Sequence, residues 1–227
     1  MRTLLTLLLV LGCAASSAHA QSPRTETTGE AFRADALAIE GLINSRYAYL
    51  DRFPEGAMPM SAALRAEAGA VADRRSLLRY AENAIAALAD HHAITGASFA
   101  DSWGLVPSYS DLWIEPEGDV WRITAVREGS PAAVAGVNPG DRLVTVGETT
   151  TGAAVAAFWA DLGLEPTGDR AGYAARVLAA GRRDRPRDLT IRDAAGTERR
   201  LTLPNLYVAG LGERPAVSTL EADGALI

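Results

Sequence analysis

The stretch REGSPAAVAGVNPGDRLVTVG, residues 127–147, decides the fold of this chain. Ser130 can cap a helix, Pro131 suits its first position because proline lacks an N–H, and Gly136 can end it after one turn. The Asn-Pro-Gly-Asp sequence that follows is a turn by residue chemistry, and the apolar, β-branched residues after it predict a strand. The stretch therefore predicts a one-turn helix, a tight turn and a strand in close succession.

Four linked elements of this stretch, GSPA, AGV, PGDRL and VG, resemble the signature of bacterial PDZ domains carried by periplasmic serine proteases. The resemblance rests on Gly129, Ser130, Pro131, Ala135, Gly136, Gly140 and Asp141. PDZ domains pair an extended peptide with a sheet edge and bind its C-terminal carboxylate on backbone N–H groups. The resemblance thus implies a partly open β-barrel with two or three helices, over residues 104–207, that binds peptide or protein C-termini.

The N-terminus has the form of a secretory signal peptide over residues 1–20. Arg2 precedes an apolar run, and Ala18-His19-Ala20 offers a cleavage site, which predicts a periplasmic or secreted protein cut after Ala20. An alternative processing site is Val-Leu-Gly-Cys at residues 10–13, which resembles a lipoprotein box. Use of that site would lipidate Cys13 and so attach the protein to a membrane. We expect no membrane attachment unless Cys13 is lipidated.

Composition excludes several kinds of chemistry. Cys13 is the single cysteine, so the processed chain would have no disulfide, thiol nucleophile or thiolate metal site. All 22 residues counted as Lys or Arg are arginines, so the chain cannot itself supply a Ser/Lys dyad or a Schiff base. The net charge of −6 also argues against non-specific nucleic-acid binding. We expect no cofactor and no nucleic-acid partner.

Residues 28–95 predict a helical cap subdomain. Apolar residues from Phe32 to Leu50 recur at intervals of three and four, which is one stripe of an amphipathic helix. Pro and Gly break the pattern at residues 54–59, and a second helical region extends to Asp90. The whole chain is therefore expected to be α+β, with an N-terminal helical hairpin or bundle of two or three helices before the sheet.

Histidines occur after this second helical region, in Asp90-His91-His92. Adjacent helical side chains point about 100° apart, so the two rings would not share a metal ion, and we interpret them as cations at a helix C-terminus. A Ser-His-Asp arrangement with Ser110, Ser130 or Ser218 is the alternative. Ser130 is already explained as a helix cap, and the sequence assigns no catalytic or metal-binding residue.

The predicted peptide groove combines two segments. Strands at residues 112–114 and 121–126 flank a turn at 116–119, and residues 110–114 then correspond to the carboxylate-binding loop and edge strand. The resemblance assigns peptide binding to Ser110, Asp111, Leu112, Trp113 and Ile114, with Tyr173 and Val177 from the groove helix. The family's loop is Gly-Φ-Gly-Φ, whereas this chain has Tyr-Ser-Asp-Leu, which would place the charge of Asp111 beside a bound carboxylate.

Amphipathic patterns predict helices at residues 153–162 and 169–180, and strands follow at 189–192 and 200–203. The arginine-rich run at 182–187 contains Asp184 and lacks interleaved aromatic residues. We interpret this run as a solvated, self-paired loop.

The wider order of signal peptide, helical cap, LADHH at residues 88–92, PDZ segment and LPNLY at 203–207 resembles the N-terminal part of C-terminal processing peptidases, the tail-specific and tricorn-core serine proteases. That family carries a serine nucleophile in a following catalytic core, of which residues 208–227 would be only the start. The resemblance implies the substrate-recognition portion of a periplasmic endopeptidase, partnered by a core domain or a second chain. The alternative is a stand-alone periplasmic PDZ adaptor that binds tails without cleaving them.

Overall fold

The computed structural model describes residues 28–209, 221–222 and 225–226. The predicted signal peptide, Cys13, Ser218 and most of the predicted start of a protease core lie outside these residues. No helix in the described ranges combines the length and apolar character needed to cross a bilayer.

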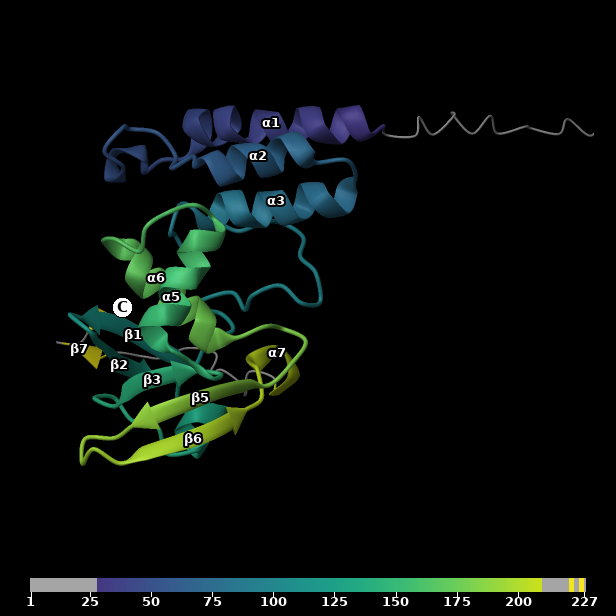
Figure 1. Ribbon diagram of the computed structural model, residues 1–227. Coiled ribbons are helices and arrows are strands. Elements are labelled where there is room, and N and C mark those ends of the chain that lie inside the picture. Colours follow the sequence, from purple (N-terminus) through teal and green to yellow (C-terminus); the bar gives the residue numbers. More distant parts are fainter. Residues whose placement is uncertain (1–27, 210–220, 223–224, 227) are drawn as a thin grey trace, which may run out of the picture.

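The N-terminal helices form one layer, drawn at the top of Figure 1. They are α1 (Gly29–Arg46), α2 (Ala62–Ala70) and α3 (Arg74–Ala86), with a short 3-10 turn η1 (Leu50–Arg52) after α1. Thr28, Ser61 and Asp73 cap the three helices by accepting bonds from backbone N–H groups. The sequence predicted two or three helices, with the second helical region extending to Asp90; the structure has three α-helices here, with a break at residues 71–73 and the last helix ending at Ala86.

Residues 127–147, on which the fold prediction was based, fold as expected. Helix α4 (Pro131–Val134) begins at Ser130, whose Oγ accepts from Ala133 N at 3.2 Å. Gly136 ends the turn with a φ of +74°, a conformation that favours glycine. Asp141 Oδ2 accepts from the N–H of Asn138 at 3.0 Å, which closes the turn before strand β3 (Arg142–Val146).

The remaining strands complete an antiparallel sheet. They are β1 (Leu112–Glu117), β2 (Val120–Val126), β4 (Thr149–Thr150), β5 (Arg187–Arg192) and β6 (Glu198–Leu203). The strand order is β1-β2-β3-β5-β6 with β4 beside β3, so the sheet stays open between β1 and β6. A short helix α7 (Leu206–Ala209) follows, and β7 (Glu221–Ala222) pairs separately with β8 (Ala225–Leu226).

Two helices, α5 (Thr151–Asp161) and α6 (Asp169–Ala180), lie between the helical layer and the sheet (Figure 1). Helix α6 is the most enclosed element, because eight of its twelve residues are buried. Trp159 of α5 is fully buried, and its Nε1 donates to Arg170 O at 2.9 Å. The fold is therefore mixed α+β, with a helical bundle stacked on a partly open sheet, as the sequence predicted.

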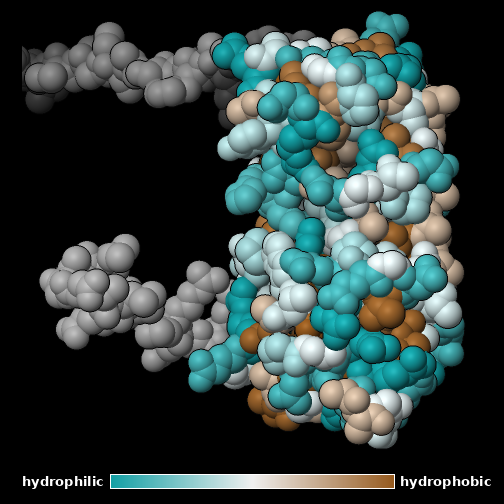
Figure 2. Space-filling model, turned by 90° about the vertical axis from the view of Figure 1, so that its left-hand side faces the viewer, coloured by the Kyte–Doolittle hydropathy of each residue, from teal (hydrophilic) through white to brown (hydrophobic). Residues whose placement is uncertain are grey.

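On the face shown in Figure 2, hydrophilic side chains predominate and apolar ones appear in small separate groups. Among the described residues, the large apolar side chains exposed on the whole surface are Leu37, Leu42, Tyr49, Ile94, Leu105, Val134 and Val208. Two of them, Ile94 and Leu105, belong to the long connection between α3 and β1, where the candidate site lies.

Candidate functional site

Strand β1 forms one edge of the sheet, and helix α6 packs beside it. The two elements approach closely at Gly172, where an added Cβ would lie 3.4 Å from Pro116 Cδ. Leu112 and Ile114 turn their side chains into the core and are 2% and 0% exposed. The edge of β1 beside α6, here called the β1–α6 groove, is the arrangement to which an extended peptide can be added.

The first two residues assigned to peptide binding are held inside the protein. Ser110 Oγ donates to Leu112 O at 2.9 Å. Asp111 Oδ2 accepts from Arg187 Nη2 at 2.5 Å and from Ala132 N at 3.1 Å, and the side chains of this ion pair are 0% and 2% exposed. The charge of Asp111 is thus directed at Arg187 and at the N-terminus of α4.

Arg187 also corrects one expectation from the sequence. The run at residues 182–187 was predicted to be a solvated, self-paired loop, and the exposed pair Asp184–Arg185 fits that description. Arg187, however, begins β5 and is buried, with Nη1 donating to Ala179 O at 2.7 Å. The prediction failed there because Asp111, distant in sequence, supplies the buried counter-charge.

A second arginine near β1, Arg176 of α6, is partly buried in the β1–α6 groove. Its Nη1 donates to Ile114 O at 3.2 Å, and its Nε donates to His91 Nε2 at 3.0 Å. The guanidinium lies 4.3 Å from the ring centre of Trp113. Burial lowers the pKa of Arg176, and no carboxylate among the described residues lies within ion-pairing distance of it. Arg176 therefore bonds only to neutral groups, while the more distant charges of Glu115 and Asp169 favour its charged form.

His91 connects Arg176 to the interior. Its ring stacks on Tyr173 at 4.5 Å and meets Trp113 edge-on at 5.9 Å. Burial, followed by the charge of Arg176, lowers the pKa of His91 to about 4. The prediction of a cationic histidine at a helix C-terminus is therefore wrong for His91, which is neutral at pH 7 and accepts a hydrogen bond on Nε2.

The serines considered as nucleophiles are engaged elsewhere. Ser130 Oγ accepts from Ala133 N and Ser110 Oγ donates to Leu112 O, so neither hydroxyl is bonded to a histidine ring. The exposed ring of His92 is bonded instead to Asp90 Oδ1, 3.0 Å from its Nδ1. Within the described residues, no three His, Cys, Asp or Glu side chains are grouped so that they could hold a metal ion.

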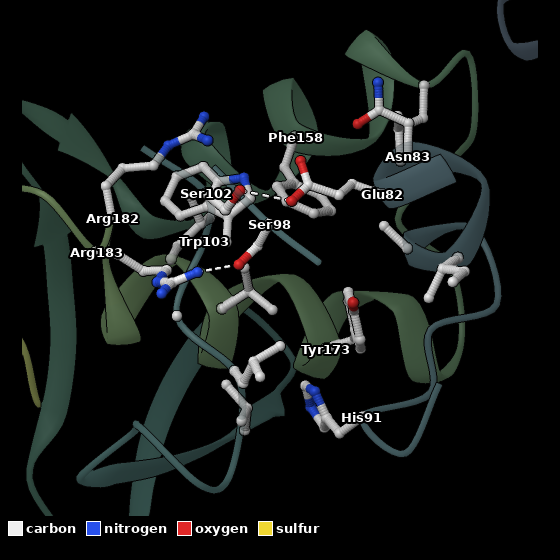
Figure 3. Close-up of a pocket in the computed structure, with 18 of the residues that line it drawn as sticks. Glu82, Asn83, His91, Ser98, Ser102, Trp103, Phe158, Tyr173, Arg182 and Arg183 are labelled. Carbon is white, nitrogen blue, oxygen red and sulfur yellow. Dashed lines mark hydrogen bonds between the residues drawn. The ribbon is translucent and has the colours of Figure 1, made fainter. Parts of the chain in front are cut away.

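A cavity of about 510 Å³ opens between the helical layer and helices α5 and α6 (Figure 3). Its inner wall is mainly apolar and includes Ile85, Phe158, Tyr173, Val177 and Leu178. Helix α3, the connection at residues 91–106, and helices α5 and α6 all contribute to it. The cavity thus forms where the helical layer meets the rest of the fold.

Arginines gather at one end of this cavity, opposite His91 and Tyr173 (Figure 3). The Arg182 guanidinium lies 3.7 Å from the ring centre of Trp103, and its Nη1 donates to Asp101 O at 3.0 Å. Arg183 lies 4.3 Å from the ring centre of Tyr207, and its Nη1 donates to Ser98 Oγ. Burial lowers the pKa of Arg182, with a further contribution from the charge of Arg79.

The residues predicted to bind peptide therefore divide between two places. Ser110 to Ile114 lie at the start of β1, whereas Tyr173 and Val177 line the cavity. Their role in peptide binding remains a prediction. Sequence reasoning missed Arg176, although a single arginine within the buried face of an alanine-rich helix was a usable signal.

Comparison with known proteins gives a distant likeness to solved structures. No family model matches the chain, and no curated protein sequence matches it. A solved structure titled photosystem II D1 C-terminal processing protease is similar with a TM-score of 0.34 and 17% sequence identity. The alignment covers 77% of this chain and 43% of that protein, so the chain spans less than half of its length.

Proposed function

We propose that this chain is the substrate-recognition portion of a periplasmic serine-type endopeptidase of the C-terminal processing family, and that it binds polypeptide C-termini in the β1–α6 groove. The sequence signature of a PDZ domain supports this proposal, as does the position of β1 at a sheet edge beside α6. Both features suit the addition of an extended peptide as a further strand.

The observation that carries the proposal is the unpaired charge of Arg176. Even partial burial disfavours a cation that has no bonded counter-ion, and a carboxylate entering the groove would supply one. Arginine can bind a carboxylate through two parallel N–H bonds, which gives both strength and orientation. In this chain Arg176 would thus perform the role that backbone N–H groups of a glycine-containing loop perform in the family.

The neutral partners of Arg176 suggest how the peptide enters. Ile114 O, on the groove side of β1, now accepts from Arg176 Nη1. An added strand needs such a carbonyl for its own backbone N–H groups. A tail that takes over Ile114 O would release one N–H of Arg176 for the terminal carboxylate, so strand pairing and charge capture would occur together.

The test is a titration of the purified chain with fluorescent peptides that end in an apolar residue, with free or amidated C-termini. We expect free tails to bind at least about tenfold more tightly than amidated ones, as a charge-assisted pair contributes about 1.5–3 kcal/mol. Arg176→Gln should remove this difference. The control is Arg192→Gln, which changes an exposed arginine on the sheet. Equal affinity for both tails, or a free-tail preference that survives Arg176→Gln, would overturn the proposal.

A further inference from the structure

We propose a second ligand site in the cavity between α3, α5 and α6, and we assign it to a free medium-chain fatty acid. This site goes beyond the proposed recognition of protein tails, because its ligand would occupy the cavity between the helical layer and α5, which Arg176 does not line. Its ligand would be an unbranched apolar chain that carries one carboxylate. The assignment rests on the lining of the cavity, the charges at its mouth and the way those charges are held.

The interior of the cavity is suited to a hydrocarbon chain. Its volume of about 510 Å³ lies within the range of roughly 300–1,000 Å³ that is usual for small-molecule sites. Along its inner part it offers the apolar side chains of Ile85, Ala86, Val146, Ala154, Phe158, Val177 and Leu178. A peptide entering this part would bury N–H and C=O groups without partners, which is costly. An acyl chain carries no such groups.

The charges that line the cavity favour an anion. Three arginines, Arg79, Arg182 and Arg183, stand against two acids, Glu82 and Asp161. Glu82 is already paired, since its Oε2 meets Arg79 Nη1 at 3.2 Å and its Oε1 accepts from Ser102 Oγ at 2.5 Å (Figure 3). Among the described residues, neither Arg182 nor Arg183 has a carboxylate within 4.0 Å.

Both arginines are held in place before any ligand arrives. Each guanidinium stacks on an aromatic ring, Arg182 on Trp103 and Arg183 on Tyr207. Stacking limits the rotamers of these long side chains, so a carboxylate would lose less entropy in binding them. The Nε of Arg183 is shielded from solvent and has no hydrogen-bond partner within the described part of the chain. A fatty-acid carboxylate at the mouth would meet two fixed, unpaired cations.

Isothermal titration of the purified chain with decanoate, below its micelle-forming concentration, tests the site. Decanol provides the chain without the charge, and acetate the charge without the chain. We expect decanol to bind at least about tenfold more weakly than decanoate, and acetate to show no saturable binding. Equal binding of decanol and decanoate would overturn the assignment of the arginines.

Variants locate the ligand. Arg182→Gln and Arg183→Gln should each weaken decanoate binding about tenfold, whereas Arg200→Gln, an exposed arginine on β6, should leave it unchanged. Ala154→Phe places a ring in the cavity and should abolish binding, with thermal unfolding used to verify that the variant folds. If it does not fold, the two arginine variants decide. Undiminished decanoate binding in both of them would overturn the proposal.

Two further measurements distinguish this site from the β1–α6 groove. Arg176→Gln should retain decanoate binding, because Arg176 does not line the cavity and its partner His91 lies at the end of the cavity away from Arg182 and Arg183. A peptide with a free C-terminal leucine should not displace decanoate. If such a peptide displaces it competitively and binds more tightly, the cavity is a peptide pocket and the fatty-acid assignment is wrong.

Discussion

Two arginines near strand β1, the buried Arg187 and the partly buried Arg176, differ in whether the chain supplies a carboxylate to pair with them. Arg187 meets the carboxylate of Asp111 at 2.5 Å with both side chains almost fully buried. Arg176 is partly buried, and its described partners are a carbonyl, a neutral imidazole and an indole ring. Arg187 has its counter-charge within the chain, although Arg187 Nε and Asp111 Oδ1 have no hydrogen-bond partner among the described residues. Arg176 has no such counter-charge and is available to an anionic ligand.

The pair at Arg187 ties several elements together. Asp111 precedes β1, Arg187 begins β5, and the same carboxylate accepts the N–H of Ala132 in α4. Arg187 also bonds to Ala179 O near the end of α6. The ion pair therefore connects the groove strand, the groove helix and the short helix of the fold-deciding stretch, and its loss would be felt in all of them.

The largest expected effect comes from breaking this pair. Asp111→Ala should lower the free energy of unfolding by about 3–5 kcal/mol, because it leaves the buried charge of Arg187 without compensation. Chemical denaturation monitored by circular dichroism measures the loss. Asp184→Asn, which removes the exposed partner of Arg185, should leave the denaturation midpoint unchanged within error. A loss at Asp111 no larger than at Asp184 would contradict the structural role.

A double substitution makes the same comparison more specific. Asp111→Ala together with Arg187→Met should recover much of the stability lost in Asp111→Ala, since replacing both members of a buried pair removes the uncompensated charge. If the double variant is as unstable as the sum of the two single variants, packing at this site matters more than charge.

The sequence predicted the regular parts of this fold because local chemistry determines them. Ser130, Pro131 and Gly136 define α4 through capping, ring geometry and a positive φ, which are properties of single residues. Helix α6 was predicted at residues 169–180, as the structure has it, from its apolar spacing. The sequence left open whether the N-terminal region has two or three helices, because apolar spacing alone did not reveal Asp73 as the cap that begins α3.

The candidate site was less predictable because it depends on contacts between distant residues. From the sequence, Asp111 was expected to place its charge beside a ligand. In the structure it pairs with Arg187, 76 positions away. His91 was interpreted from the sequence as a helix-terminal cation. In the structure its ring stacks on Tyr173, which is distant in the sequence, and partial burial keeps the ring neutral. Burial and partner identity come from tertiary packing, so patterns within one segment did not reveal them.

A change of pH is expected to alter the free energy of unfolding to an intermediate extent, because it changes the protonation of His91. Its pKa is about 4 in the folded chain against 6.5 ordinarily, so between these values the unfolded chain binds the additional proton. Stability from this ring is present above pH 6.5 and decreases as the pH falls toward 4, by roughly 2 kcal/mol. Denaturation midpoints from pH 7 to 4 measure this slope. His91→Gln should flatten it, and His92→Gln is the matched control. An unchanged slope in His91→Gln would contradict the buried, neutral ring.

The smallest effect on stability is expected at Arg176 itself. Arg176→Met removes a partly buried charge that has no bonded counter-ion and keeps much of the aliphatic packing, so the lost hydrogen bonds and the lost contact with Trp113 are offset. The free energy of unfolding should stay within about 1 kcal/mol of the parent, in contrast to a loss of about 3–5 kcal/mol for Arg187→Met, which leaves Asp111 buried and unpaired.

These two methionine variants decide what the comparison means. If Arg176→Met leaves the fold stable but abolishes the preference for free over amidated tails, the unpaired arginine serves binding and the paired one serves folding. If Arg176→Met costs as much stability as Arg187→Met, then the contacts to Ile114 O and His91 fix the packing of α6 against β1. In that case Arg176 would be a structural residue of the closed sheet edge, and the carboxylate of a bound tail would need another cation.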